Sequence, residues 1–118
     1  MAIEYGRRIN VFAYELTAAA GLRLPDLPTF LTEHFAQCGE DLIVAALIEA
    51  RCRRLGLDPA AQRYCEIGGN HPIATSATFL LNRKLGMTGV IVEANPALLA
   101  DLRSARPDDE IVHAAVTD

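Results

Sequence analysis

The chain has 118 residues, of which 51% are hydrophobic and 22% are charged. This composition is typical of one soluble globular domain and excludes an intrinsically disordered chain. The net charge of −4 and the isoelectric point of about 5.3 do not indicate a nucleic-acid-binding surface. No apolar run approaches the roughly 18 residues that span a bilayer, and no secretory signal is evident, so we expect a cytoplasmic protein without membrane contact.

The cysteine and histidine positions argue against a disulfide framework and against a metal site. Cys38, Cys52 and Cys65 lie far apart without a C-x-x-C pair, which favours a reducing compartment. His34 and His113 have no carboxylate or cysteine at the spacing of metal ligands. We therefore expect no bound metal.

The first 60 residues are expected to form a helical segment. Apolar residues on one stripe predict a helix over residues 5–20 that Gly21 ends. Thr29 is a suitable N-cap for a short turn through Phe35. These elements would cover a face of the sheet or make a subunit contact.

A further helix is predicted from about Glu40 to Leu55, closed by Gly56. Its expected apolar face consists of Leu42, Ile43, Ala46, Leu47 and Ala50. Acidic residues begin this helix and a cluster of arginines ends it, as the helix dipole favours. Alternatively, the arginine cluster binds a phosphate. Gln37, Glu40 and Asp41 either cap the start of the helix or close over a ligand.

Residues 63–86 predict a strand, a glycine turn and a helix. The apolar run at Tyr64, Cys65 and Ile67 breaks at two glycines, and apolar residues then recur with helical spacing over 73–85. Pro72 suits the first helical turn, and Gly86 supplies the stop.

The remaining residues repeat this alternation. Residues 89–93 are a predicted buried strand, after which Asn95 is an N-cap and Pro96 the first helical residue. Residues 106–109 are expected to form a loop, and 111–116 a third strand.

The resulting fold class is α/β, with a β-α-β-α-β unit preceded by N-terminal helices. Right-handed crossovers between parallel strands give the spatial order 3-2-1, which is the first half of a Rossmann-like sheet. We accordingly divide the chain into a helical segment, 1–60, that packs on the sheet, and a partial nucleotide-binding domain, 61–118.

Ligands of such sheets bind where the strands end at their carboxyl sides. The candidate site residues at these strand ends are Glu66, Gly68, Gly69, Asn70, Glu93, Asn95 and Asp118. The two glycines would allow the backbone to approach a ligand closely. Glu93 follows Gly68 at about the spacing at which an acid binds ribose hydroxyls.

The glycine turn is poorly suited to a phosphate. It lacks a third glycine in register, Pro72 removes one amide donor, and Glu66 adds negative charge. These features favour a ligand with a ribose and a positive charge, such as S-adenosylmethionine (SAM), over a nicotinamide dinucleotide.

Four segments resemble FkbM-type SAM-dependent methyltransferases, in the right order over residues 35–118. They are Phe35-Ala-Gln-Cys-Gly-Glu-Asp41, Cys65-Glu-Ile-Gly-Gly-Asn-His-Pro72, Ile91-Val-Glu-Ala-Asn-Pro96 and Ala114-Ala-Val-Thr-Asp118. The resemblance implies that Glu66, Gly68 and Asn70 line the methionine end of SAM, that Glu93 binds the ribose, and that Asp118 lies near the adenine. It also implies methyl transfer to a hydroxyl of a small-molecule or glycan-type acceptor.

The family's later strands, which carry the acceptor site, do not follow in this sequence. We expect either that a missing C-terminal half covers the free edge of the first strand, or that a partner or second copy does, which would make the protein a homo-oligomer. The alternatives to a methyltransferase half are a non-catalytic SAM-binding, nucleoside-binding or oligomerisation module and half of an NAD-dependent oxidoreductase. Catalytic residues are not identified, since His71 is a candidate base but also a plausible structural residue at the start of a helix.

Overall fold

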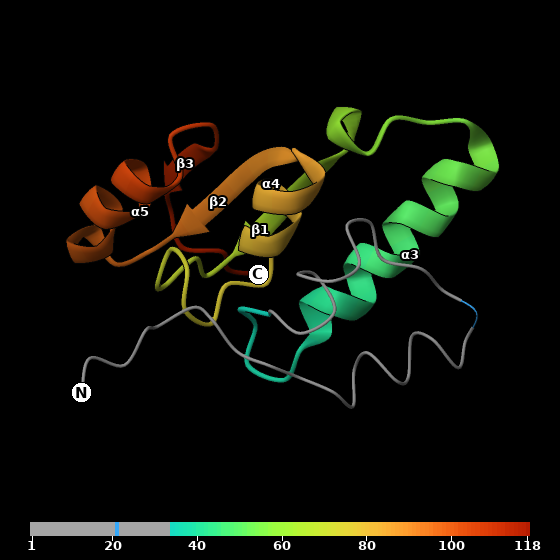
Figure 1. Cartoon of the computed structure of the whole chain (residues 1–118). Helices are drawn as coiled ribbons and strands as arrows, with labels where there is room; N and C mark the ends of the chain where they lie inside the picture. The colour runs from blue at the N-terminus through green and yellow to red at the C-terminus, as the bar shows by residue number, and fades with distance from the viewer. Residues whose placement is uncertain (1–20, 22–33) are drawn as a thin grey trace.

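The structure is a computed structural model that describes Gly21 and residues 34–118. In chain order its elements are α3 (Glu40–Leu55), η1 (Pro59–Ala61), β1 (Arg63–Ile67), α4 (Phe79–Leu85), β2 (Thr88–Glu93), η2 (Pro96–Leu98), α5 (Leu99–Ala105) and β3 (Glu110–His113). Figure 1 shows their arrangement. The helix expected over residues 5–20 and the beginning of the turn expected from Thr29 lie outside the described residues.

The three strands form one parallel sheet in which β2 lies between β1 and β3. The described part of the chain therefore has the predicted α/β class. In the pairing of β1 with β2, Tyr64 lies beside Gly89 and Glu66 beside Ile91. Because side chains alternate between the faces of a sheet, these residues and Glu93 share one face.

The three α-helices of the described residues, α3, α4 and α5, lie on the side of the sheet that carries Tyr64 and Ile91. The main core is formed by the segment before α3, by α3 and α4, and by the second residue after α4. It consists of Phe35, Leu42, Ala45, Ala46, Phe79, Leu80, Leu81, Leu85 and Met87. Tyr64 packs against this core from β1. A Cβ at Gly69 would meet both Ile91 of β2 and Leu102 of α5, so α5 covers the same face.

The opposite face of β1 is exposed to solvent in the part of the chain that the structure describes. Arg63, Cys65 and Ile67 are all exposed, and the exposed fraction of Ile67 is 64%. Within the described ranges β1 pairs with β2 alone, so it forms an edge of the sheet. Parallel sheets are normally covered on both faces, and this edge strand departs from that pattern.

The predicted helix over 40–55 is confirmed with the same bounds, and Gly56 closes it in a left-handed conformation at φ 66°. Its predicted apolar face is partly wrong. Leu47 is 52% exposed, whereas Ala45 and Cys52 are buried in its place. The buried stripe is rotated because α3 packs on α4 along the side that carries Leu42, Ala45 and Ala46.

The start of the helix after the glycine turn is also predicted wrongly. Pro72 does not open it, and α4 begins at Phe79 and has seven residues. The segment before it is an irregular loop in which Thr75 has a positive φ of 68°. Side-chain acceptors bind the backbone amides of this loop and thereby compete with helix formation.

The second half of the chain agrees more closely with its prediction. β2 begins one residue before the predicted strand, and Gly86 ends α4 in a left-handed conformation. Asn95 caps η2 through a hydrogen bond of 3.0 Å from the Ala97 amide to its Oδ1, and Pro96 follows as predicted. The third strand ends at His113 instead of residue 116, and residues 114–118 form an exposed tail.

Candidate functional site

The carboxyl end of the central strand carries a buried carboxylate, Glu93, which is only 7% exposed. Its Oε2 accepts a hydrogen bond of 2.7 Å from the amide of Asn70, and its Oε1 accepts one of 2.7 Å from the amide of Asn95. These two amides hold the pKa of Glu93 below its ordinary value of 4.5, since they stabilise the charged form. Glu93 is thus an ionised group that joins the loop after β1 to the turn after β2.

The two glycines of the turn have different structural roles. Gly68 has a φ of 78°, a conformation that favours glycine, and a Cβ added there would meet nothing within 4 Å. A Cβ added at Gly69 would lie 2.4 Å from Cγ2 of Ile91. Gly68 therefore faces open space, whereas Gly69 is required by the packing of the turn against the sheet.

Glu66 faces the loop before α4. Its Oε1 accepts a hydrogen bond of 3.1 Å from the Ala77 amide, and its Oε2 accepts hydrogen bonds from the hydroxyls of Ser76, at 3.3 Å, and Thr78. Both carboxylate oxygens of Glu66 are therefore engaged within the fold, and they fix the residues that precede α4.

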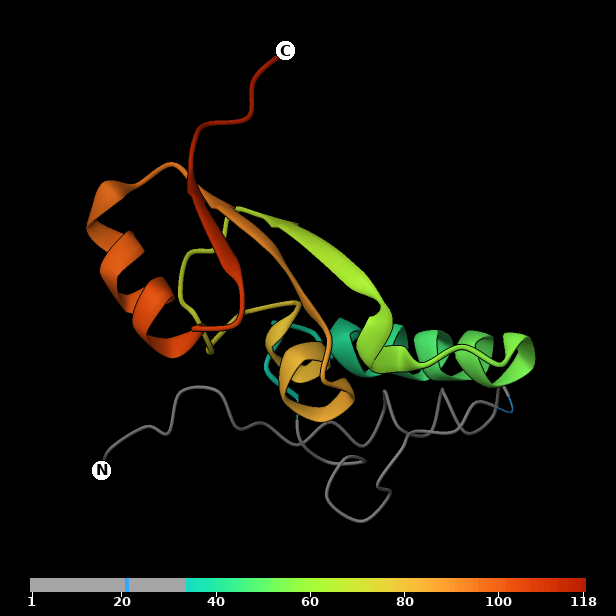
Figure 2. The same ribbon diagram turned by 90° about the horizontal axis from the view of Figure 1, so that it is seen from above.

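The other predicted site residues lie in separate environments. Asn70, with a positive φ of 46°, and Asn95 are exposed and flank Glu93 through their amides. Asp118 ends the exposed tail, which runs away from the body of the protein in Figure 2. The structure brings together Gly68, Asn70, Glu93 and Asn95 at the ends of the strands, and it leaves Asp118 apart from them.

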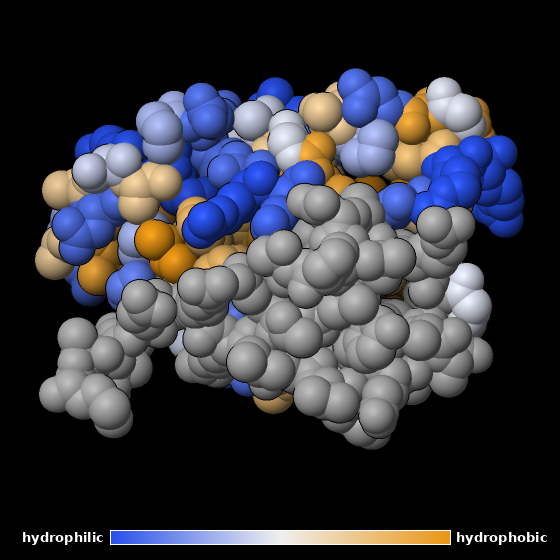
Figure 3. Space-filling model, in the orientation of Figure 1, coloured by the Kyte–Doolittle hydropathy of each residue, from blue (hydrophilic) through white to orange (hydrophobic). Residues whose placement is uncertain are grey.

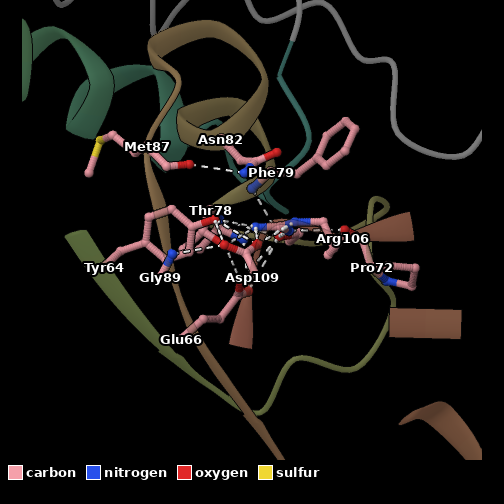
Figure 4. A network of polar contacts seen from close by, with 12 residues as sticks. Tyr64, Glu66, Pro72, Thr78, Phe79, Asn82, Met87, Gly89, Arg106 and Asp109 are labelled. Atoms are coloured by element: carbon pink, nitrogen blue, oxygen red, sulfur yellow. Dashed lines mark hydrogen bonds and ion pairs between the residues drawn. The ribbon is translucent and has the colours of Figure 1, made fainter. Parts of the chain in front are cut away.

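A second polar cluster is buried under β1 and was not anticipated from the sequence (Figure 4). Its centre is Arg106, which is 1% exposed. Arg106 pairs with Asp109 at 2.8 Å, and its Nη2 donates to the hydroxyls of Tyr64 at 2.8 Å and Thr78 at 3.0 Å. Its Nη1 donates to the Pro72 carbonyl at 3.2 Å. One guanidinium therefore connects the loop after α5 to the loop before α4.

Asp109 and Tyr64 complete this cluster at the beginning of the strands. Asp109 accepts hydrogen bonds from the Tyr64 hydroxyl, at 2.7 Å, and from the Gly89 amide, at 2.8 Å. Burial, followed by the hydrogen bond to Asp109, raises the pKa of Tyr64 to about 12. The sequence signal was limited to an arginine and an aspartate three positions apart beside a proline, which resembles an ordinary surface turn.

Several further side chains that were open to a functional interpretation have structural partners. Asp41 is buried, and its Oδ2 accepts from the amides of Phe35, at 2.7 Å, and Ala36, at 3.2 Å. Burial raises the pKa of Asp41, although these amides oppose the shift. Nδ1 of His71 accepts from the amide of Ala74 at 2.8 Å, which shapes the loop.

In the part of the chain that the structure describes, no group of three or more histidine, cysteine, aspartate or glutamate residues is arranged to hold a metal ion. Among the same residues, no helix is both long enough and apolar enough to cross a bilayer.

A scan against protein-family models, a search of curated proteins and a search of solved structures each found no match to this chain.

Proposed function

We propose that this chain is the cofactor-binding half of a SAM-dependent methyltransferase of the FkbM type, with a Rossmann-like sheet in the order 3-2-1. The main support is the position of Glu93. It is a buried, ionised carboxylate at the carboxyl end of the central strand, and its oxygen lies 2.7 Å from the amide of Asn70 in the glycine turn. An acid at this position of an open α/β sheet is suited to bind ribose hydroxyls.

The residues around Glu93 fit the ribose end of SAM. Each Glu93 oxygen accepts one backbone hydrogen bond, and a carboxylate oxygen can accept a second from a ribose hydroxyl. Gly68 presents a backbone without a side chain toward open space, and Asn70 and Asn95 are exposed on either side. Glu93 would hold the ribose, with Asn95 beside it, and Gly68 and Asn70 would line the methionine side.

The contribution of Glu66 to this site is indirect. Its carboxylate oxygens are bound by Ala77, Ser76 and Thr78, so it holds the loop between Gly68 and α4 in place. The methionine end of SAM would then contact the loop itself. Asp118 would reach the adenine only if the tail after β3 folds back toward the strand ends.

The reaction that SAM supplies when bound is transfer of its methyl group to a nucleophile, here a hydroxyl of a small-molecule or glycan-type acceptor. The protein's part is to place the two groups in line, which lowers the barrier by orientation. A partner or second copy that covers the exposed edge strand β1 would contribute the acceptor site.

Titration calorimetry with SAM tests this proposal. We expect the chain to bind SAM and S-adenosylhomocysteine. Because Glu93→Gln replaces one acceptor oxygen by an amide donor, it should weaken both affinities by at least about tenfold, whereas Glu110→Gln, on an exposed residue of β3, should not. Circular dichroism verifies that each variant is folded.

The outcomes separate the proposal from its alternatives. Production of S-adenosylhomocysteine by the chain indicates an enzyme, whereas SAM binding alone is expected both of a cofactor-binding half and of a non-catalytic SAM-binding or nucleoside-binding module. Tighter binding of NAD than of SAM indicates the oxidoreductase half. Absence of SAM binding, or equal affinity in the parent and in Glu93→Gln, contradicts the proposal.

A further inference from the structure

Helix α3 carries an exposed stripe on the side opposite its buried face. The stripe consists of residues at alternating spacings of four and three: Glu40, Val44, Leu47, Arg51 and Arg54. All five are exposed in the described structure. Spacings of four and three place residues on one face of an α-helix, and this spacing is the one that helix pairs use for their contact seam.

The middle of the α3 stripe is apolar. Val44 is 40% exposed and Leu47 is 52% exposed, although the sequence pattern had placed Leu47 in the core. A surface hollow beside them is lined by Leu47, Ala50, Arg51 and Arg54. Figure 3 shows apolar surface next to strongly hydrophilic atoms at the end of the molecule where α3 finishes, where Leu55 and Leu57 are also exposed.

The two ends of the α3 stripe carry opposite charges. Glu40 lies in the first helical turn, and Arg51 and Arg54 lie near the C-terminal end. Neither of these arginines forms an ion pair within the described ranges, whereas Arg53, off the stripe, pairs with Glu49 at 2.6 Å. The stripe thus has a negative end, an apolar centre and a positive end that offers two guanidinium groups.

We propose that the α3 stripe is a homodimer interface in which two copies of α3 pack antiparallel about a two-fold axis. With the axis between Val44 and Leu47, each Val44 lies against Leu47 of the second copy. Each Glu40 then lies opposite Arg51 of the second copy, so that two ion pairs flank two apolar layers. The same patch serves both copies, as in the isologous contacts of most homodimers.

The opposite charges at the two ends of the α3 stripe favour a second copy of α3 as the partner and an antiparallel orientation of the two helices. A parallel arrangement of two copies would place Glu40 against Glu40 and arginines against arginines, whereas the antiparallel arrangement places opposite charges together at both ends. Antiparallel helix dipoles are favourable as well. The contact of one helix pair is small compared with the roughly 1,200–2,000 Å² of a stable interface, so we expect a weak dimer. This interface does not depend on the proposed function.

Sedimentation equilibrium of the full chain over a series of concentrations tests the interface. We expect the average mass to rise from monomer to dimer with concentration. Leu47→Glu should remain a monomer throughout, because it buries a carboxylate at the centre of the contact. Leu57→Glu, which changes another exposed leucine outside the stripe, should dimerise like the parent.

Charge reversal tests the antiparallel arrangement itself. Glu40→Arg and Arg51→Glu should each raise the dissociation constant about tenfold, since the two-fold axis turns two attractions into repulsions. The double variant Glu40→Arg/Arg51→Glu should recover an affinity close to that of the parent. Arg83→Glu, on the exposed side of α4, provides the matched control.

Three results would overturn the proposal. A monomeric parent at every concentration excludes the interface. A dimer that Leu47→Glu leaves unchanged uses another surface, such as the edge of β1. A double variant that is weaker than both single variants excludes the pairing of Glu40 with Arg51.

Discussion

The two connections from a strand to the following helix are built in different ways. The connection after β1 runs through residues 68–78, and much of its shape is set by Glu66, ten or more residues before its partners, and by Arg106, which is remote in the sequence. The connection after β2 is short, and Asn95 organises it through hydrogen bonds with its immediate neighbourhood. The comparison shows that a turn defined by local caps can be predicted from sequence, whereas one defined by a buried charge cannot.

The most severe way to break the first connection is Arg106→Met, which removes the buried guanidinium but retains much of the side-chain volume. Asp109 then loses its buried ion-pair partner, and the Pro72 carbonyl loses a donor. We expect a loss of about 4 kcal/mol in the free energy of unfolding, measured by urea denaturation. Amide hydrogen exchange should accelerate in residues 70–78 and stay unchanged around Asn95.

Arg103→Met serves as the control for Arg106→Met. Arg103 is an exposed arginine on α5, so its replacement should cost well under 1 kcal/mol. A loss below about 1 kcal/mol in Arg106→Met, or faster exchange in both connections alike, would show that Arg106 does not organise the first connection specifically.

A milder change to the first connection is Tyr64→Phe, which removes one hydroxyl between Arg106 and Asp109. Hydrogen bonds to charged groups are worth about 2 kcal/mol, so we expect a loss of that size at neutral pH. Because the pKa of Tyr64 is raised from 10.0 to about 12, its contribution to stability is complete below pH 10 and is lost as the pH rises toward 12.

The difference in the free energy of unfolding between Tyr64→Phe and the parent should therefore become smaller in alkaline solution. Denaturation at neutral pH and near pH 12 measures this difference, and the ultraviolet absorbance of tyrosinate should lack one late ionisation step in the variant. A stability difference that is the same at both pH values would contradict the assigned role of the Tyr64 hydroxyl.

These two connections also explain which parts of the fold could be predicted. The bounds of α3 follow from acids at its start and Gly56 at its end, and the strands follow from short apolar runs. The start of α4 could not be predicted. Ile73 and Ala77 have helical spacing, but the amides of Ile73 and Ala74 donate to His71 and the amide of Ala77 donates to Glu66. A periodic pattern does not record such competition for backbone donors.

In the candidate site, too, features set by neighbouring residues could be predicted, whereas features set by more distant residues could not. The position of Glu93 at the end of a buried strand could be predicted from the short apolar run before it, and the turn at Asn70 from its two glycines. The separate role of Glu66 was missed because its partners lie ten or more residues further along the chain. The sequence predicts that Gly69 lets a ligand approach the backbone. In the structure, a Cβ at this position would overlap Ile91 of β2, so glycine is needed here for packing.

The smallest expected effect belongs to the second connection. Asn95→Ala removes the side-chain oxygen that caps η2, so it should cost about 1 kcal/mol in the free energy of unfolding. Asn95→Asp keeps an oxygen acceptor at the cap, but it adds a negative charge near Glu93, which partly offsets that benefit. The order of stability should therefore be parent, Asn95→Asp, Asn95→Ala, with hydrogen exchange in residues 70–78 unchanged. Faster exchange there in Asn95→Ala would mean that the two connections are coupled through Glu93, because Glu93 binds the amides of both Asn70 and Asn95.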